Sequence, residues 1–326
     1  MNELLNILLG DRPLLVTPEG YRQAAVPLVP LIAVGENPAA KPLGTVKQPM
    51  QFFFGEPPTY SAETKKALAQ LRLQLPLTEQ GEDIFPMTDD FSDDSLPTDT
   101  VAYHRVWGFI TGSSRYYFSS KQLEQDVLAA EDNPKISAHL LHINSAGGEA
   151  WYLDRLSETL RQAKKPIVTL CEGTMCSAAY YIGCHGQKVY ATTLSDFVGS
   201  IGTMTSFHDY EGWYEQMGVK LIEARATQSD LKNKMADDLV KGKPEQYVHD
   251  VLDPINDAFL AEVKAMRPAL AKMDADHPVL RGEVYLATRA CQVGLIDDTS
   301  KLLYVLIELR SMVNNRRQID SILDAI

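Results

Sequence analysis

A serine that could act as a nucleophile stands at position 177, within the run Gly173–Ala179. An apolar stretch leads into this run through a glycine, which predicts a strand, a sharp turn and a short helix beginning at Ser177. A hydroxyl in the first turn of a helix meets the positive end of the helix dipole, which stabilises developing negative charge. Serine is also a common N-cap, so the segment alone does not distinguish a nucleophile from a cap.

Three further segments carry residues that could assist such a serine. Gly147 and Gly148 follow a predicted buried strand, where glycine N–H groups can approach a ligand closely or simply form a tight turn. Ser200 lies in a Gly-Ser turn between apolar residues. Lys232 and Lys234 lie in a polar segment, where lysines are normally solvated. A catalytic lysine would have to be buried and largely deprotonated.

Cysteine and histidine residues do not predict a metal site. Four cysteines in a chain this long do not form a disulfide framework and indicate a reducing compartment, so a cytoplasmic protein is expected. Cys176, Cys184 and His185 lie close in sequence but lack the paired spacing of a zinc site. The sequence contains no phosphate-binding loop or dinucleotide fingerprint, so no cofactor is expected.

Predicted strands and helices alternate around these segments. Strands are expected at 101–111, 136–143, 166–170, 189–191 and 219–224, and helices at 62–74, 119–130, 149–164, 177–183, 244–272 and 302–326, with Pro254 and Pro268 interrupting the longest. This alternation is typical of βαβ units and predicts an α/β fold with a mostly parallel sheet.

Charge and hydropathy exclude some classes of protein. Acidic residues outnumber basic ones 43 to 31, for a net charge of −12, which argues against non-specific nucleic-acid binding. No apolar stretch reaches the length of a membrane span, and the first ten residues lack the features of a signal peptide. We therefore expect neither a nucleic-acid partner nor a membrane span.

The distribution of charge and proline suggests four parts. Residues 79–99 hold eight carboxylates and no Lys or Arg, which predicts a solvated, flexible acidic linker. The alternative is that Phe85, Met87 and Phe91 within it dock onto a partner. We expect an N-terminal extension at 1–78, the linker at 79–99, the main domain at 100–300 and a C-terminal helix at 301–326.

In their order, these segments resemble the signal peptide peptidase A family of serine peptidases, over about residues 101–298. The family's Asp-Ser-Pro-Gly-Gly is here Asn-Ser-Ala-Gly-Gly at 144–148, its Met-Ala-Ala-Ser-Gly-Gly-Tyr-Tyr is Thr-Met-Cys-Ser-Ala-Ala-Tyr-Tyr at 174–181, and its Thr-Gly-Ser-Ile-Gly is Val-Gly-Ser-Ile-Gly at 198–202. Gly-Glu-Val-Tyr at 282–285 and Gly-Leu-Ile-Asp at 294–297 match its last segments. The resemblance implies a ClpP–crotonase-like fold of repeated ββα units and a Ser–Lys serine endopeptidase domain at 100–300.

The resemblance also assigns roles to residues. It makes Ser177 the nucleophile and a lysine about fifty residues later the general base; Lys232, followed by Asn233, fits better than the alternative Lys234. Ser200 would orient that lysine. The oxyanion hole would use the N–H groups of Gly147 or Gly148 and of Ala178.

This chain departs from the family pattern at several positions, which leaves alternatives open. Ala146 replaces the usual proline, and Ala178 and Ala179 replace two glycines. Cys176 beside Ser177 could be considered as nucleophile, but it is one residue out of register with the motif. An inactive scaffold or assembly protein of the same fold is one alternative. An acyl-CoA enzyme of the crotonase type is another, which the serine and lysine positions argue against.

The N-terminal stretch 4–19 is similar to that of phage- and prophage-encoded members of the family. Those members process head and scaffold proteins during capsid maturation. The resemblance therefore implies a protein or peptide substrate, a homo-oligomer and capsid or scaffold partners. A cellular peptidase that degrades signal peptides or other peptides remains the alternative. Each protomer is expected to hold both Ser177 and its lysine.

Overall fold

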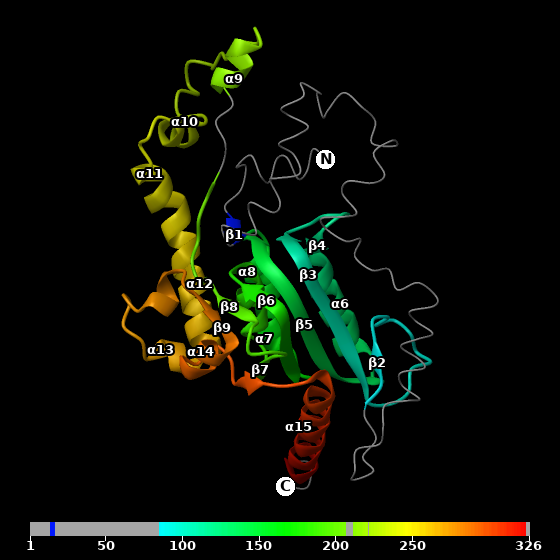
Figure 1. Ribbon diagram of the computed structural model, residues 1–326. Coiled ribbons are helices and arrows are strands. Elements are labelled where there is room, and N and C mark those ends of the chain that lie inside the picture. Colours follow the sequence, from blue (N-terminus) through cyan, green and yellow to red (C-terminus); the bar gives the residue numbers. More distant parts are fainter. Residues whose placement is uncertain (1–13, 17–84, 207–210, 221, 324–326) are drawn as a thin grey trace.

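The computed structural model describes residues 14–16, 85–206, 211–220 and 222–323, drawn in colour in Figure 1. A single sheet runs through the centre, with the strand order β10-β7-β6-β5-β3-β2. These strands are β2 (Met87–Thr88), β3 (Thr100–Thr111), β5 (Ile136–Glu149), β6 (Ile167–Cys176), β7 (Lys188–Ala191) and β10 (Asp298–Thr299). All neighbours along this path are parallel, as the alternation of strands and helices predicts.

Helices cover one face of the sheet with most of the hydrophobic core. They include α6 (Ser120–Asp132), α7 (Leu153–Gln162), α8 (Ala178–Gly183), α12 (Asp253–Met266) and α14 (Ala287–Gln292). Leucines at 153, 156 and 160 form the predicted apolar stripe of α7 and are buried. Ser119 caps α6 by accepting a hydrogen bond from the N–H of Gln122 at 3.2 Å.

The opposite face of the sheet packs against α15 (Leu302–Leu323). Val305, Leu306, Leu309 and Val313 of this helix are buried against Val101, Leu140 and neighbouring side chains of the sheet. The C-terminal helix expected at 301–326 therefore forms part of the domain core; residues 324–326 lie outside the described part of the chain.

The described part of the acidic segment differs from the flexible linker that its charge predicts. Met87–Thr88 adds a strand beside β3, and Asn133 Nδ2 donates to the carbonyl oxygens of Phe91 and Asp93 at 3.0 and 3.2 Å. Phe85 and Phe91 pack against the core. The aromatic and apolar side chains anchor the segment, Asp89, Asp90 and Asp94 are exposed, and Asp99 forms an ion pair with Arg317 of α15, so residues 85–99 pack on the domain as an acidic face.

The strand β5 is longer than predicted. It continues through Ser145 to Glu149, where the sequence suggests a turn, and α7 begins only at Leu153. The reason is continued pairing with β3, whose Phe109 and Ile110 lie opposite Gly147 and Gly148. Since β6 likewise extends past Leu170 to Cys176, both strands reach the edge of the sheet where the candidate residues lie.

Residues 211–220 and 222–252 form an arm that extends away from the sheet (Figure 1). It contains α9 (Glu211–Gln216), α10 (Lys234–Val240), α11 (Glu245–Tyr247) and a π-helical turn at Val248–Leu252 that leads into α12. The described residues of the predicted strand 219–224 are not in a strand and are exposed, since they lie in the arm, away from the sheet (Figure 1). Pro254 does not interrupt the helix, since it lies in the first turn of α12.

The remaining elements complete this domain. They are β1 (Leu14–Val16), β4 (Phe118–Ser119), β8 (Phe197–Gly199), β9 (Val284–Leu286), α13 (Pro268–Ala271) and a 3-10 turn at Pro278–Arg281. Apart from β1, the expected N-terminal extension, including the helix predicted at 62–74, lies outside the described residues. Among the helices that the structure describes, none combines the length and the apolar character that crossing a bilayer requires.

Candidate active site

Ser177 lies at the junction between β6 and α8. Its backbone has φ +56° and ψ −121°, a left-handed conformation that is costly for a residue with a side chain. The residue is fully buried, and its Oγ has no hydrogen-bond partner within the described residues. A buried hydroxyl without a hydrogen-bond partner loses the free energy of its hydration, so a structural role alone does not account for this serine.

Ser200 lies beside Ser177 because their two strands run in parallel. Cys176 of β6 is in register with Gly199 of β8, and the N–H of Ser177 donates to Gly199 O at 2.9 Å. The N–H of Ser200 donates to Glu283 O at 2.8 Å. A Cβ at Gly199 would lie 2.6 Å from that same oxygen, so the turn requires glycine. Ser200, with φ +55°, is the second strained serine here.

Gly147 and Gly148 reach the same edge of the sheet from β5. Ser145 is in register with Met175 of β6, so the two glycines lie just beyond the point where these strands pair. A Cβ at Gly148 would lie 1.9 Å from Ile110 O, which excludes any side chain. The N–H of Gly147 donates to Ser145 Oγ at 3.1 Å. The structure thus gathers Ser177, Ser200 and both glycines at the ends of neighbouring strands.

The helix that follows Ser177 is tightly anchored. Ala178 and Ala179 are completely buried, so the methyl groups that replace the family's glycines pack into the core. Tyr180 is buried as well, and its hydroxyl donates to Leu295 O at 2.8 Å. Because α8 has only six residues, these contacts rather than its own hydrogen bonds fix its position.

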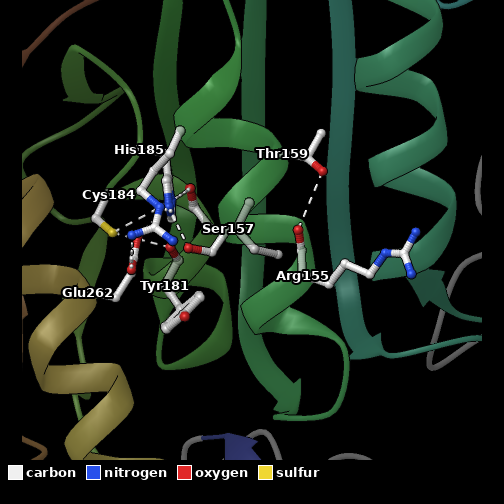
Figure 2. Close-up of polar contacts among 9 residues, drawn as sticks. Arg155, Ser157, Thr159, Tyr181, Cys184, His185 and Glu262 are labelled. Atoms are coloured by element: carbon white, nitrogen blue, oxygen red, sulfur yellow. Dashed lines mark hydrogen bonds and ion pairs between the residues drawn. The ribbon is translucent and has the colours of Figure 1, made fainter.

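A buried polar cluster at the end of α8 joins three helices, as Figure 2 shows. His185 Nε2 lies 2.9 Å from Glu262 Oε1 of α12 and 3.2 Å from Ser157 Oγ of α7, while Nδ1 lies 3.1 Å from Ile182 O. Burial alone would lower the pKa of His185. Cys184 and the Glu262 carboxylate outweigh it and raise that pKa to about 10, so His185 is protonated at neutral pH.

This cluster is not a second catalytic triad. A histidine base needs its serine and its carboxylate on opposite ring nitrogens, whereas Ser157 and Glu262 both contact Nε2. The sequence offered only a weak metal-site interpretation of Cys184 and His185. Within the described residues, no group of three or more His, Cys, Asp or Glu side chains is arranged to hold a metal ion.

Neither candidate lysine joins the serines in this single chain. Both lysines lie in the arm and are exposed: Lys234 is the first residue of α10, and Lys232 lies just before it. Lys234 Nζ forms an ion pair with Asp238 one turn along the same helix. Figure 1 shows α10 far from α8, so the arm does not bring a lysine to Ser177 in this arrangement.

Cys176 is poorly suited to act as a nucleophile. It is fully buried, its Sγ lies 3.8 Å from Phe197 O, and burial raises its pKa to about 12. The thiolate is the nucleophilic form of cysteine, and it is essentially absent at neutral pH when the pKa is this high.

A strained, buried serine between a glycine-lined strand end and a helix N-terminus is an arrangement suited to acyl transfer. The Clp protease family model matches residues 109–198, which cover β3, β5, β6 and Ser177. Fold and site together define a serine peptidase with the ClpP-like α/β fold.

A second family model, peptidase family S49, matches residues 159–315. The chain belongs to this family, the signal peptide peptidase A family of serine peptidases. No curated protein matches the chain in a sequence search.

Two features of the site could not be foreseen from the sequence. The pairing of His185 with Glu262 joins residues far apart in the chain, and neither shows a motif. The second is β1, whose residues 14–16 pair antiparallel with Gly147–Glu149. Only the short apolar run between prolines at 13 and 18 marks that segment in the sequence.

Proposed function

We propose that the protein is a serine endopeptidase that cleaves peptide bonds through an acyl-enzyme on Ser177. The observation that carries the proposal is the Ser177 hydroxyl, which is buried in a strained backbone turn and has no hydrogen-bond partner among the residues that the structure describes. It lies beside Ser200 and the glycine-lined end of β5. Strain of this kind is retained where the surrounding structure fixes it for a function.

The proposed reaction needs a base, for which Lys232 is the first candidate and Lys234 the alternative. The neutral amine takes the proton from Ser177 Oγ as the oxygen attacks the substrate carbonyl carbon. The N–H groups of Gly147 or Gly148 and of Ala178 stabilise the oxyanion, and Ser200 orients the lysine. The lysine then gives its proton to the departing amine, and water releases the acyl group by the same steps.

The arm must bring its lysine to Ser177 for this chemistry. It can fold back within its own subunit, as expected when each protomer holds a complete pair, or it can reach the serine of a second copy. Burial next to Ser177 would also lower the lysine's pKa, because desolvation disfavours the charged amine. The unpartnered Ser177 Oγ gives the arriving amine a hydrogen-bond acceptor and donor.

For the substrate, we propose head or scaffold proteins of a phage or prophage, supported by the similarity of the N-terminal stretch to phage-type members. The alternative is a cellular peptidase that degrades signal peptides or other peptides. A second candidate function, an inactive assembly protein of the same fold, is favoured by the exposure of Lys232 and Lys234.

The test is covalent labelling with a fluorophosphonate, read by intact mass, on wild type, Ser177→Ala, Lys232→Ala and Lys234→Ala. We expect one adduct on the wild type and loss of labelling in Ser177→Ala and Lys232→Ala. Loss in Lys234→Ala instead would move the base by two residues. A folded wild type that does not label up to about pH 9, where a shifted lysine is neutral, would favour the inactive assembly protein.

Mixing variants separates the two routes of the arm. Ser177→Ala and Lys232→Ala are each expected to be inactive on denatured casein. If the lysine crosses between copies, an equimolar mixture regains part of the activity, because a mixed assembly contains intact pairs. If the arm folds back within one subunit, the mixture stays inactive.

A further inference from the structure

The two edges of β5 near the glycines have different neighbours. On one edge, β3 continues the sheet, with Phe109 opposite Gly147 and Ile110 opposite Gly148. On the other edge, β6 pairs with β5 only as far as Ser145, opposite Met175. The strand β6 ends at Cys176, and the chain turns at Ser177 into α8. Over Gly147–Glu149, β6 therefore does not pair with this edge of β5.

The strand β1 occupies that open edge. Leu14, Leu15 and Val16 pair antiparallel with Glu149, Gly148 and Gly147, in that order. Because β3 holds the other edge of the same residues, β1 must lie on the side from which β6 departs, the side of Ser177. A segment from the start of the chain thus lies as an extended strand next to the candidate nucleophile.

We propose that residues 14–16 are an internal ligand of the peptide-binding edge and compete with the substrate strand. This proposal rests on the proposed peptidase function of Ser177. A polypeptide whose carbonyl is attacked by Ser177 with its oxyanion near Gly147 and Gly148 must lie along Gly147–Glu149. An extended peptide adds to such an edge through main-chain hydrogen bonds. Substrate and β1 cannot hold the same edge together.

The chemistry of the segment fits a short, weak ligand. Pro13 and Pro18 bracket the run Leu-Leu-Val-Thr and have no N–H to donate, so only the residues between them offer uninterrupted pairing. Three paired residues bind weakly by themselves, but a tethered segment acts at an effective concentration in the millimolar range. The ligand class that this edge takes is an extended, apolar peptide.

The first test alters the backbone of β1. Leu15→Pro removes the N–H of the central residue, and Leu15→Ala is the matched control that keeps it. With fluorescein-labelled denatured casein, Leu15→Pro should lower KM about three- to tenfold with kcat unchanged, as expected for loss of a tethered millimolar competitor. Leu15→Ala should stay closer to the wild type. Equal KM values in all three proteins would overturn the proposal.

A second measurement does not depend on catalysis. In Ser177→Ala, amide hydrogen exchange of the peptide that carries Gly147–Glu149 should be slow, and adding Leu15→Pro should accelerate it. Unchanged exchange would overturn the internal-ligand proposal even if the wild type is an active peptidase. Accelerated exchange in a protein that fluorophosphonate never labels would instead leave β1 as assigned and remove the peptidase function.

A third test supplies the segment in trans. A synthetic peptide with the sequence of residues 12–18 should inhibit casein cleavage by Leu15→Pro competitively, and a peptide with proline at the central leucine should not. If both peptides inhibit equally, or neither does, the pairing of β1 does not represent substrate competition.

Discussion

Residue-scale features of the site explain why a serine rather than the adjacent cysteine is the candidate nucleophile. Ser177 has a left-handed backbone that turns the chain out of β6, whereas Cys176 is still paired with Gly199 as the last residue of the strand. A one-residue shift in a strand exchanges the two faces of the sheet. The side chains of these neighbours therefore meet different surroundings: Cys176 Sγ lies 3.8 Å from Phe197 O, whereas Ser177 Oγ has no hydrogen-bond partner in the described part of the chain.

Thiol labelling of the native protein tests this difference. Burial raises the pKa of Cys176 to about 12 and that of Cys171 well above its usual value, while Cys291 is partly exposed. We expect iodoacetamide at pH 8 to modify Cys291 alone, and all four cysteines after denaturation. Intact and peptide mass give the sites, with Cys291→Ser as the control. Rapid modification of Cys176 in the folded protein would contradict its assigned burial.

The types of the site residues were predictable from the sequence, but their spatial arrangement was predictable only in part. The sequence predicted a strand ahead of Ser177 and ahead of the glycine pair, but only a turn at Ser200. In the structure Ser177 follows β6, Ser200 follows β8 and the glycine pair lies near the end of β5, and parallel strands end at the same edge of a sheet. The position of Lys232 and Lys234 was not predictable, because a polar segment without apolar periodicity gives no information on what it packs against.

At the scale of elements, α8 is held by its neighbours, and the His185–Glu262 pair is its main polar link to α12. The side chains are 1% and 9% exposed, so both charges are removed from water. Arg161 also approaches Glu262, at 3.4 Å, but its side chain is 47% exposed. Because α12 continues from the arm, this pair connects the nucleophile helix with the element that carries the lysines.

Replacing His185 should therefore destabilise the fold in a pH-dependent way. Removing one partner of a buried ion pair costs about 3–5 kcal/mol, and we expect His185→Gln to lose an amount of this order at pH 6. The folded pKa of His185, about 10, lies above the unfolded value near 6.5, so the stabilisation is complete below about pH 6.5 and is lost as the pH rises towards 10.

Urea denaturation at pH 6 and pH 9 measures this effect. The difference between wild type and His185→Gln should shrink as the pH rises. Arg161→Gln, at the exposed end of the cluster, is the matched control and should cost less than about 1 kcal/mol at both values. A difference that grows with pH would show that His185 is neutral in the folded protein.

Two segments adopt a structure that their local sequence does not predict. Residues 144–149 look like a turn because of Gly147 and Gly148, but β3 on one edge and β1 on the other keep them extended. The acidic segment 85–99 looks solvated by its charge, although a few apolar side chains suffice to dock it. In both cases tertiary pairing, which is not encoded locally, overrides the local signal.

At the scale of the whole molecule, the arm is the feature that a single chain does not explain. Its described residues expose large apolar side chains, with Ile222 90% and Leu231 72% exposed. Grouped exposure of this kind is typical of surfaces that are covered in an assembly. ClpP-like proteases typically oligomerise, and we expect the arms to be covered by further copies of this chain.

Placing a charge on the arm should separate the copies. Burying a carboxylate without a partner in an apolar contact is strongly unfavourable, so Ile222→Asp and Leu231→Asp should shift the assembly towards the 36.2 kDa monomer in light scattering after size exclusion. Gln228→Asp adds the same charge at an exposed polar position of the arm and should leave the assembly intact. A wild type that is already monomeric at micromolar concentration would contradict this role of the arm.

The same variants link assembly to chemistry. If the lysine of one copy completes the site of another, Ile222→Asp should lose fluorophosphonate labelling together with its assembly, although Ser177 and Lys232 are both unchanged. If the arm folds back within its own subunit, the monomeric variant should still label. If Ile222→Asp loses its assembly but still labels, Ser177 and its lysine belong to one protomer. The exposed apolar residues of the arm would then serve assembly alone.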